Sequence, residues 1–298
     1  MFNKLSALLF VFFTAGISHA SDPVFITYGF GPGPGDTIIR TLAIDAENQG
    51  ASKFRVENKP GAGGVVALRE YYKLPSSGSK LLGISGGQTV VEPAQNPENN
   101  FLPRMRVIGP VITFPLAITV NADGEFNSMD DFFDRKKPRR TVNIAVGGPI
   151  HEMLVTLITK HSHHDVQAIR FKGGADQAAA LRGRHVDAEV NSYGAFLPRE
   201  NVKILAVTQA QALPNAPSIL KWVPEANLVN FFAIAINKEV ADTKSLERVL
   251  TAGFVANKRQ DFWQNQGYAV DLNTKADFVE RVMIPDLIRL QKILSTNK

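Results

Sequence analysis

The residues best suited to chemistry in this chain are glycines in short loops, each standing between an apolar run and a helical pattern. Two such loops cover 31–37 and 147–151 of the 298-residue sequence. A helix that opens on such a loop leaves unpaired backbone N–H groups at the positive end of its dipole, and these bind an anion without a basic side chain. We therefore expect an anion site built mainly from backbone. The alternative for either loop is that its glycines and prolines only make a tight turn.

Neither loop matches a nucleotide-binding pattern. Asp36 stands where the dinucleotide fingerprint requires its third glycine, and no Gly-Lys-Ser or Gly-Lys-Thr triplet supplies a phosphate loop. The sequence therefore does not support nucleotide binding.

Ser85 is a formal candidate for a nucleophile. Segment 83–87, Gly-Ile-Ser-Gly-Gly, matches the Gly-x-Ser-x-Gly turn that presents a catalytic serine. That turn requires a substantial helix after the serine, whereas Pro93 and Pro97 follow closely, and no histidine has a diagnostic context as the base. We expect Ser85 to donate its hydroxyl to a ligand or to occupy a turn.

The histidine-rich stretch 161–165, His-Ser-His-His-Asp, is the candidate for a metal site. It follows a predicted helix, where polar and cationic residues are expected in any case, and its side chains would point in different directions. The chain has no cysteine, which excludes disulfides, iron–sulfur clusters, thiolate zinc sites and cysteine nucleophiles. We expect neither a metal nor a cofactor.

The composition is that of a folded protein with a real core. Hydrophobic residues make up 44% and charged residues 20%, which excludes intrinsic disorder, collagen and coiled coil. The net charge of +5 is compatible with anionic ligands but too small to indicate nucleic acid.

The first twenty residues have the pattern of an export signal. Lys4 gives a positive start, 5–15 is an apolar run, and the small residues Ser18 and Ala20 precede a cleavage site after Ala20. The run is too short for a bilayer-spanning helix, which takes about 20 residues; an uncleaved interfacial helix is the alternative. We expect an exported mature protein that starts at Ser21, has a net charge of +4 and contains no second membrane span.

The elements that must position the glycine loops are alternating strands and helices. Strands are predicted over 25–30, 54–56, 80–84, 107–113, 116–120, 142–146, 167–171, 186–190, 202–207 and 231–236. Helical patterns follow the loops, and the long C-terminal helix expected over 274–294 contains Pro285, which should kink it. This alternation predicts parallel α/β sheets. The charged stretch 121–140 marks a break between two halves.

Several motifs resemble the Bug receptors, which are the TctC-like extracytoplasmic solute-binding proteins of tripartite tricarboxylate transporters. The most specific is segment 56–64, Val-Glu-Asn-Lys-Pro-Gly-Ala-Gly-Gly. The likeness continues, in order along nearly the whole mature chain, at 31–37, 81–87, 171–175, 181–187, 205–208 and 213–217.

The resemblance implies a two-lobed α/β fold of the type II periplasmic-binding-protein (Venus flytrap) class, with mostly parallel sheets flanked by helices. Lobe 1 would comprise 21–119 and 231–298, and lobe 2 would comprise 120–230, with chain crossings near 116–121 and 229–237. The implied function is that of a periplasmic receptor, not an enzyme. It would capture a small organic anion, expected to be a carboxylate, and deliver it to membrane transporter subunits. The receptor is expected to be a monomer. A ligand-sensing component of a signalling system and an exported enzyme on the same fold are the alternatives.

The resemblance also implies a ligand site with one jaw on each lobe. The first jaw consists of Gly33, Pro34, Gly35, Asp36 and Thr37, supported by Ser85 and Gly86. The second jaw consists of Gly147, Gly148, Pro149 and His151, with Lys172, Gly173 and Gly174 behind it. Asn191 also belongs to the implied site. It replaces an aspartate that some relatives carry, which weakens the case for a cationic amine on the ligand. The loop at 147–149 is shorter than the family's usual one, so the second jaw is expected to be altered.

Overall fold

The fold is given by a computed structural model that describes residues 22–50, 52–196, 201–213, 216–265, 267–272 and 277–295. The expected export signal, positions 214–215 of segment 213–217 and the expected start of the C-terminal helix at Thr274 lie outside these ranges. No helix within the described ranges is long and apolar enough to cross a membrane.

Two sheets share one long strand, β5 (Val111–Asn121). Its first half, up to Pro115, pairs with β10 (Val229–Asn237) and β11 (Ala269–Asp271). From Leu116 onward it pairs with β8 (Ala188–Ser192) and β9 (Val202–Val207). The first sheet is completed by β1 (Val24–Tyr28), β2 (Phe54–Asn58), β3 (Lys80–Ser85) and β4 (Met105–Val107), and the second by β6 (Thr141–Val146) and β7 (Asp165–Arg170).

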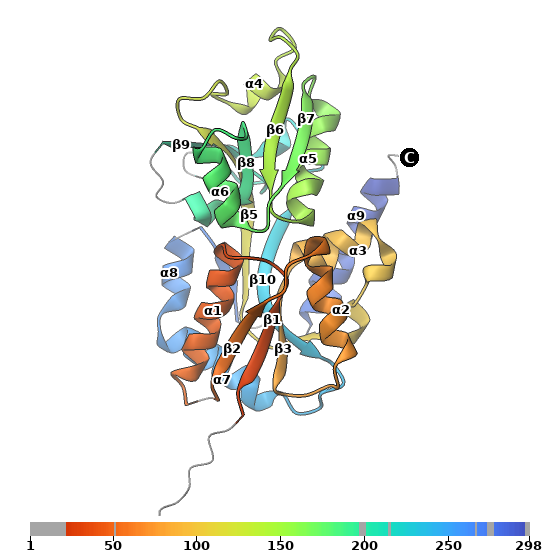
Figure 1. Ribbon diagram of the computed structural model, residues 1–298, viewed down its shortest axis with the longest axis vertical. Coiled ribbons are helices and arrows are strands. Elements are labelled where there is room, and N and C mark those ends of the chain that lie inside the picture. The colour runs from red at the N-terminus through yellow and green to blue at the C-terminus, as the bar shows by residue number, and fades with distance from the viewer. Residues whose placement is uncertain are drawn as a thin grey trace, which may run out of the picture.

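Each sheet has its own covering helices and forms one lobe (Figure 1). The first lobe carries α1 (Pro34–Glu47), α2 (Val65–Lys73), α3 (Glu92–Gln95), α7 (Lys244–Ala256), α8 (Arg259–Asn265) and α9 (Ile284–Ser295). The second lobe carries α4 (Met129–Phe133), α5 (Pro149–His161) and α6 (Gly174–Arg182). The strands β5 and β10 run where the two lobes meet.

The glycine loops open helices, as the sequence predicts. α1 begins at Pro34 after Gly33, and α5 begins at Pro149 after Gly148. Proline suits the first helical position because its missing N–H has no intrahelical partner there. Both helices follow parallel strands, so their N-terminal ends lie at the edge of each sheet that faces the other lobe (Figure 1).

The expected two-lobed α/β fold is present, with two corrections to its strands. The sheets are mixed rather than mostly parallel, because β5 and β10 run antiparallel to their neighbours; the parallel pairs are those of β1 and β6. Two strands were predicted, over 107–113 and 116–120. In the structure Val107 ends β4, whereas 111–113 and 116–120 belong to one continuous strand, β5. Pro115 suggests a break in the sequence, but it sits where β5 changes sheets and a missing N–H is tolerated.

The C-terminal helical segment contains a π-helix next to its internal proline. A π-helix, Val279–Met283, runs directly into α9, and Pro285 is the second residue of α9. A proline ring clashes with the carbonyl four residues earlier in an α-helix. The disturbance expected at Pro285 therefore takes the form of a π turn.

Candidate binding site between the lobes

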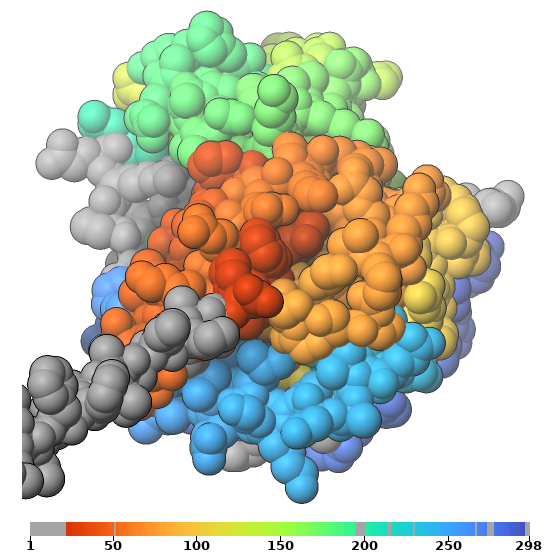
Figure 2. All heavy atoms as spheres, turned by 60° about the horizontal axis from the view of Figure 1, so that its bottom comes forward, coloured from red at the N-terminus to blue at the C-terminus, as the bar shows by residue number. Residues whose placement is uncertain are grey.

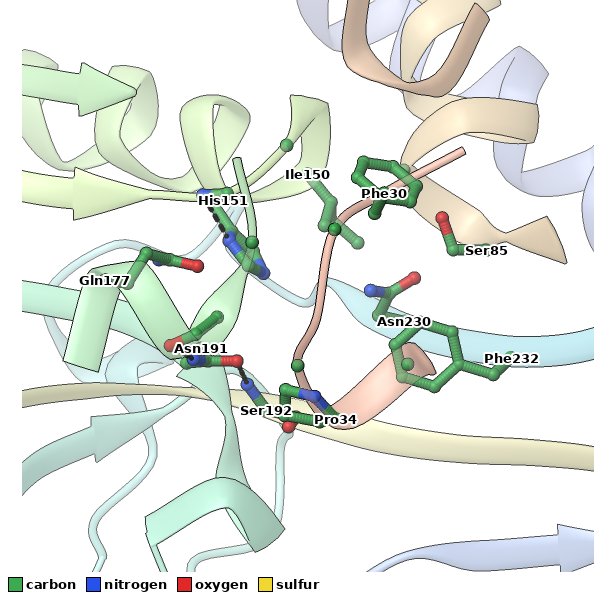
Figure 3. Close-up of a pocket in the computed structure, with 18 of the residues that line it drawn as sticks. Phe30, Pro34, Ser85, Ile150, His151, Gln177, Asn191, Ser192, Asn230 and Phe232 are labelled. Carbon is green, nitrogen blue, oxygen red and sulfur yellow. Dashed lines mark hydrogen bonds between the residues drawn. The ribbon is translucent and has the colours of Figure 1, made fainter. Parts of the chain in front are cut away.

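A cavity of about 60 Å³ lies between the lobes, at the crossing strands (Figure 3). Eleven of the residues expected at the site line it, from both lobes: Gly33, Pro34, Gly35, Ser85, Gly147, Gly148, Pro149, His151, Gly173, Gly174 and Asn191. The loops that open α1, α5 and α6 thus meet around one space.

The first jaw presents the N-terminus of α1. The first intrahelical bond runs from the N–H of Thr37 to the carbonyl of Gly33 (3.0 Å), so the N–H groups of Gly35 and Asp36 precede it. Gly35 packs so closely that an added Cβ would lie 2.0 Å from Tyr28 Oη and 2.5 Å from the ring of Phe232. Only glycine fits this position without a shift of both aromatic rings.

The second jaw presents the N-terminus of α5 and one imidazole. The N–H of His151 bonds to the carbonyl of Gly148 (3.0 Å), and Pro149 has no N–H, which leaves the N–H of Ile150 in the first turn. The N–H of Gly147 donates to Nδ1 of His151 (3.0 Å) and is therefore occupied. The backbone of this jaw offers fewer donors than its glycine content suggests.

His151 is neutral in this setting. Burial lowers its pKa from 6.5 to about 4. Because Nδ1 accepts the bond from Gly147, the proton of the neutral ring resides on Nε2. The ring reaches into the cavity (Figure 3), so His151 supplies an uncharged N–H donor there.

Other polar side chains around the cavity are also neutral. Asn230 accepts from the N–H of Phe231 through Oδ1 (2.9 Å), which leaves its Nδ2 as a donor facing the space between the jaws (Figure 3). Ser85 adds a hydroxyl. Burial, and secondly the Asp36 carboxylate, raise the pKa of Tyr28 well above its usual range, so its phenol stays protonated.

The cavity lining within the described residues contains no Lys, Arg, Asp or Glu. The rest of its wall is apolar and is formed by Phe30, Phe114, Ile150 and Phe232. Two helix N-termini and several neutral donors therefore converge on one uncharged, largely apolar space. Such an arrangement suits an organic anion, because helix dipoles and N–H groups stabilise negative charge.

Four residues expected at the site do not line the cavity: Asp36, Thr37, Gly86 and Lys172. Asp36 turns away to Arg40 Nε (3.0 and 3.1 Å) and Asn58 Nδ2 (2.7 Å). Thr37 Oγ1 donates to its own helix, at the carbonyl of Gly33 (3.1 Å). Lys172 contributes its carbonyl, which accepts from the N–H of Gly31 (3.2 Å) across the lobes.

The motif at 56–64 supports the site from outside the cavity. Asn58 Nδ2 donates to the carbonyl of Phe30 (2.8 Å) as well as to Asp36, which ties the first jaw to β2. Gly63 has a φ of 62°, and a Cβ there would lie 2.6 Å from Pro149 of the second jaw. On the face shown in Figure 2, the surfaces of the two lobes meet near this loop.

The other candidate chemistries find little support in the geometry. Ser85 is followed by a π-helix, Gly87–Val91, and by the four-residue α3, and no hydrogen bond joins it to His151 among the described residues. In the histidine-rich stretch, His161 Nε2 pairs with Glu225 (3.1 Å) and His163 Nε2 with the carbonyl of Lys137 (3.1 Å). The described part of the chain contains no group of three potential metal ligands.

Several lining residues were not expected from the sequence, and of these Tyr28, Gln177, Ser192 and Asn230 have polar side chains. Asn230 could have been predicted as a site residue, because it is a polar residue beside the apolar run 231–236. Gln177 lies one turn into the helix after Gly173–Gly174, where nothing local distinguishes it from an exposed residue. Tyr28 lies within the predicted strand 25–30.

Comparison with known proteins adds a family match. A model described as "Tripartite tricarboxylate transporter family receptor" matches residues 38–256. A relative from Pseudomonas sp. (strain P51), described as a UPF0065 protein in the tcbD–tcbE intergenic region, is 24% identical over 229 residues. The match covers 71% of this chain and 65% of that relative, so it spans just under two thirds of the relative's length.

Solved structures share the fold. The periplasmic binding protein BugD superposes with a TM-score of 0.82 at 20% identity, over 92% of this chain and 97% of that chain. MatC of Rhodopseudomonas palustris with bound malate gives 0.77 at 17% identity, over 91% and 98%. A further R. palustris protein with adipate gives 0.79 at 18% identity, over 92% and 96%. These likenesses confirm the periplasmic-binding-protein fold.

Proposed function

Because the chain belongs to the tripartite tricarboxylate transporter receptor family, we propose that it captures a small carboxylate between its two lobes and delivers it to a membrane transporter of that type. The resemblance to the Bug receptors is confirmed by the same match. The observation that carries the ligand proposal is the convergence of the α1 and α5 N-termini on one uncharged cavity.

The ligand class has independent support from related folds. Malate and adipate, which two of the similar structures hold, are both small dicarboxylates. In this chain one carboxylate would be held by the N–H groups of Gly35 and Ile150 and by His151 Nε2. The carbon skeleton would lie against Phe114 and Phe232.

The family match and the proposed leader both support a place of action outside the cytoplasmic membrane. We place the mature protein in the periplasm, with cleavage after Ala20. Its partners there would be the membrane subunits of the transporter, and the receptor would act as a monomer. Co-purification of the tagged receptor with those subunits, with and without ligand, would test this step.

We propose that the lobes comprise 21–119 with 231–298, and 120–230, and that they close on the ligand. The change of partners along β5 at Pro115–Leu116 supports a hinge there. The bond from the N–H of Gly31 to the carbonyl of Lys172 and the one between the hydroxyls of Ser192 and Tyr268 (3.2 Å) join the lobes and would form on closure. Small-angle scattering should show a smaller radius of gyration with saturating ligand; an unchanged radius at full occupancy would favour a rigid binder.

Calorimetric titration tests the ligand class directly. The purified mature protein should bind at least one member of a panel of mono-, di- and tricarboxylates, while the matching carboxamides should not bind. Micromolar affinity would correspond to about 8 kcal/mol of binding free energy. If amides bind as well as acids, or if no carboxylate binds, the proposal is wrong.

A further inference from the structure

Among the polar side chains of the cavity, Gln177 presents a buried amide oxygen, which can accept a hydrogen bond but cannot donate one. The side chain is fully buried on α6. Its Nε2 donates to two backbone carbonyls of the second sheet, those of Ala145 (3.1 Å) and Val190 (2.7 Å). Reversing the amide would set its oxygen against both carbonyls, so the hydrogen-bond network fixes the orientation.

The fixed amide leaves Oε1 on the cavity side without a partner. Among the described residues no donor reaches this buried oxygen, and Figure 3 shows it directed toward the space beside His151. A Cβ added at Gly147 would lie only 2.3 Å from it, so glycine at that position keeps the approach open. A buried acceptor left unpaired is unfavourable, and such groups are normally satisfied by a ligand or an ordered water.

The required partner must carry a proton that a carboxylate lacks. A carboxylate is ionised near neutral pH and only accepts hydrogen bonds. An ammonium group could donate, but among the residues that the structure describes no acidic side chain lines the cavity to compensate its charge. The amide of Asn191 is already engaged, with Nδ2 on Glu189 (2.8 Å) and Oδ1 on the N–H of Ser192 (2.9 Å). A hydroxyl meets the requirement without adding charge.

We propose that the cavity selects a hydroxy acid, with Gln177 Oε1 accepting the hydrogen bond of the ligand's hydroxyl. This inference rests on the proposed carboxylate-binding function. It makes Gln177 a specificity-determining residue, whereas the helix N-termini supply the affinity for the anion.

Matched ligand pairs test the inference on the unmodified protein. Malate, lactate and citrate are titrated calorimetrically against succinate, propionate and propane-1,2,3-tricarboxylate, which lack only the hydroxyl. In the best-binding pair the hydroxy acid, as its tighter enantiomer, should bind at least about tenfold more tightly. Equal or tighter binding of the deoxy acid would overturn the inference, as would tighter binding of aspartate than of malate. If none of these six acids binds while another carboxylate of the panel does, the inference is wrong and the carboxylate proposal stands.

A pair of variants separates recognition from stability. Gln177→Met should bring the hydroxy-to-deoxy affinity ratio close to one. Gln88 is the matched control. It is also a fully buried amide whose Oε1 has no partner within the described part of the chain, but it does not line the cavity. Gln88→Met should leave the ratio unchanged. If folded Gln177→Met keeps the wild-type ratio of hydroxy-acid to deoxy-acid affinity, the assignment is wrong. If that variant does not fold, the ligand pairs on the unmodified protein decide.

Discussion

The backbone N–H of Gly147 donates a hydrogen bond to Nδ1 of His151, 3.0 Å away. Because of this contact, the N–H of Gly147 is not available to a ligand. The Nε2–H of the neutral His151 ring is available instead. The second jaw therefore offers a side-chain donor where a backbone donor was expected, and it still adds no charge to the cavity.

The depressed pKa of His151 predicts a loss of stability in mild acid. Its pKa is about 4 in the folded protein and 6.5 ordinarily, so between these values the unfolded chain binds the extra proton. The free energy of unfolding should fall as pH falls through this window, by roughly 2–3 kcal/mol from this group. The control is His151→Asn, whose amide oxygen can still accept from Gly147. In urea denaturation, the difference in unfolding free energy between the wild type and this variant should shrink from pH 7 to pH 4. A pH-independent difference would contradict the assigned protonation state.

Substitution of Gly35 should lower the affinity for carboxylate much more than substitution of Lys172. Gly35→Ala places a methyl against Tyr28 Oη and Phe232, so carboxylate affinity should fall by about tenfold or more, the worth of one charge-assisted hydrogen bond. Lys172→Ala should change affinity less than about threefold, since its side chain does not line the cavity. Gly78→Ala, where a Cβ would meet nothing within 4 Å, controls for the substitution itself. A large effect of Lys172→Ala beside a small effect of Gly35→Ala would mean that side-chain charge binds the ligand.

The start of each jaw could be predicted from the sequence, whereas the direction of its side chains could not. Glycine followed by proline marked the first turns of α1 and α5 correctly. Asp36 belongs to the same turn as Gly35, but the rotation along the helix carries its side chain away from the cavity to Arg40 and Asn58. That outcome depends on a partner on β2, which helical periodicity does not reveal.

The crossing strands were the least predictable part of the fold. Their apolar pattern shows burial but not partners, so the switch of β5 between sheets at Pro115 looked like the end of a strand. For the same reason Asn230 and Phe232, which β10 brings to the cavity, were missed. Their role arises from pairing between segments more than a hundred residues apart.

Asn58 should contribute to both stability and binding. Asn58→Ala removes the donor to the Phe30 carbonyl and to the Asp36 carboxylate, which should cost about 1–3 kcal/mol of unfolding free energy. Affinity for the carboxylate should fall as well, because the first jaw loses its tie to β2. Glu57→Ala changes the neighbouring exposed side chain and should leave both quantities unaltered. Equal behaviour of the two variants in denaturation and calorimetry would refute this role.

Thr208 joins the two crossing segments and should be the more sensitive of two buried threonines. Its Oγ1 accepts from the N–H of Leu116 (3.0 Å) and donates to the carbonyl of Leu228. Thr208→Val leaves both buried groups unpaired and should lower the unfolding free energy by about 2–4 kcal/mol. Thr119 is equally buried, but no partner of its hydroxyl is found among the described residues, so Thr119→Val should be neutral or stabilising. Urea denaturation of both variants measures the two changes in unfolding free energy. Equal changes would show that the Thr208 hydroxyl does not stabilise the contact between the two crossing segments.

Backbone N–H groups from both lobes are proposed to hold the ligand's carboxylate. A crystal structure of the protein with its tightest-binding carboxylate tests this most directly. We predict carboxylate oxygens at about 2.7–3.2 Å from the N–H groups of Gly35 and Ile150, with no Lys or Arg side chain at that distance. A carboxylate held instead by a lysine or arginine side chain, or bound outside the cavity between the lobes, would contradict the account.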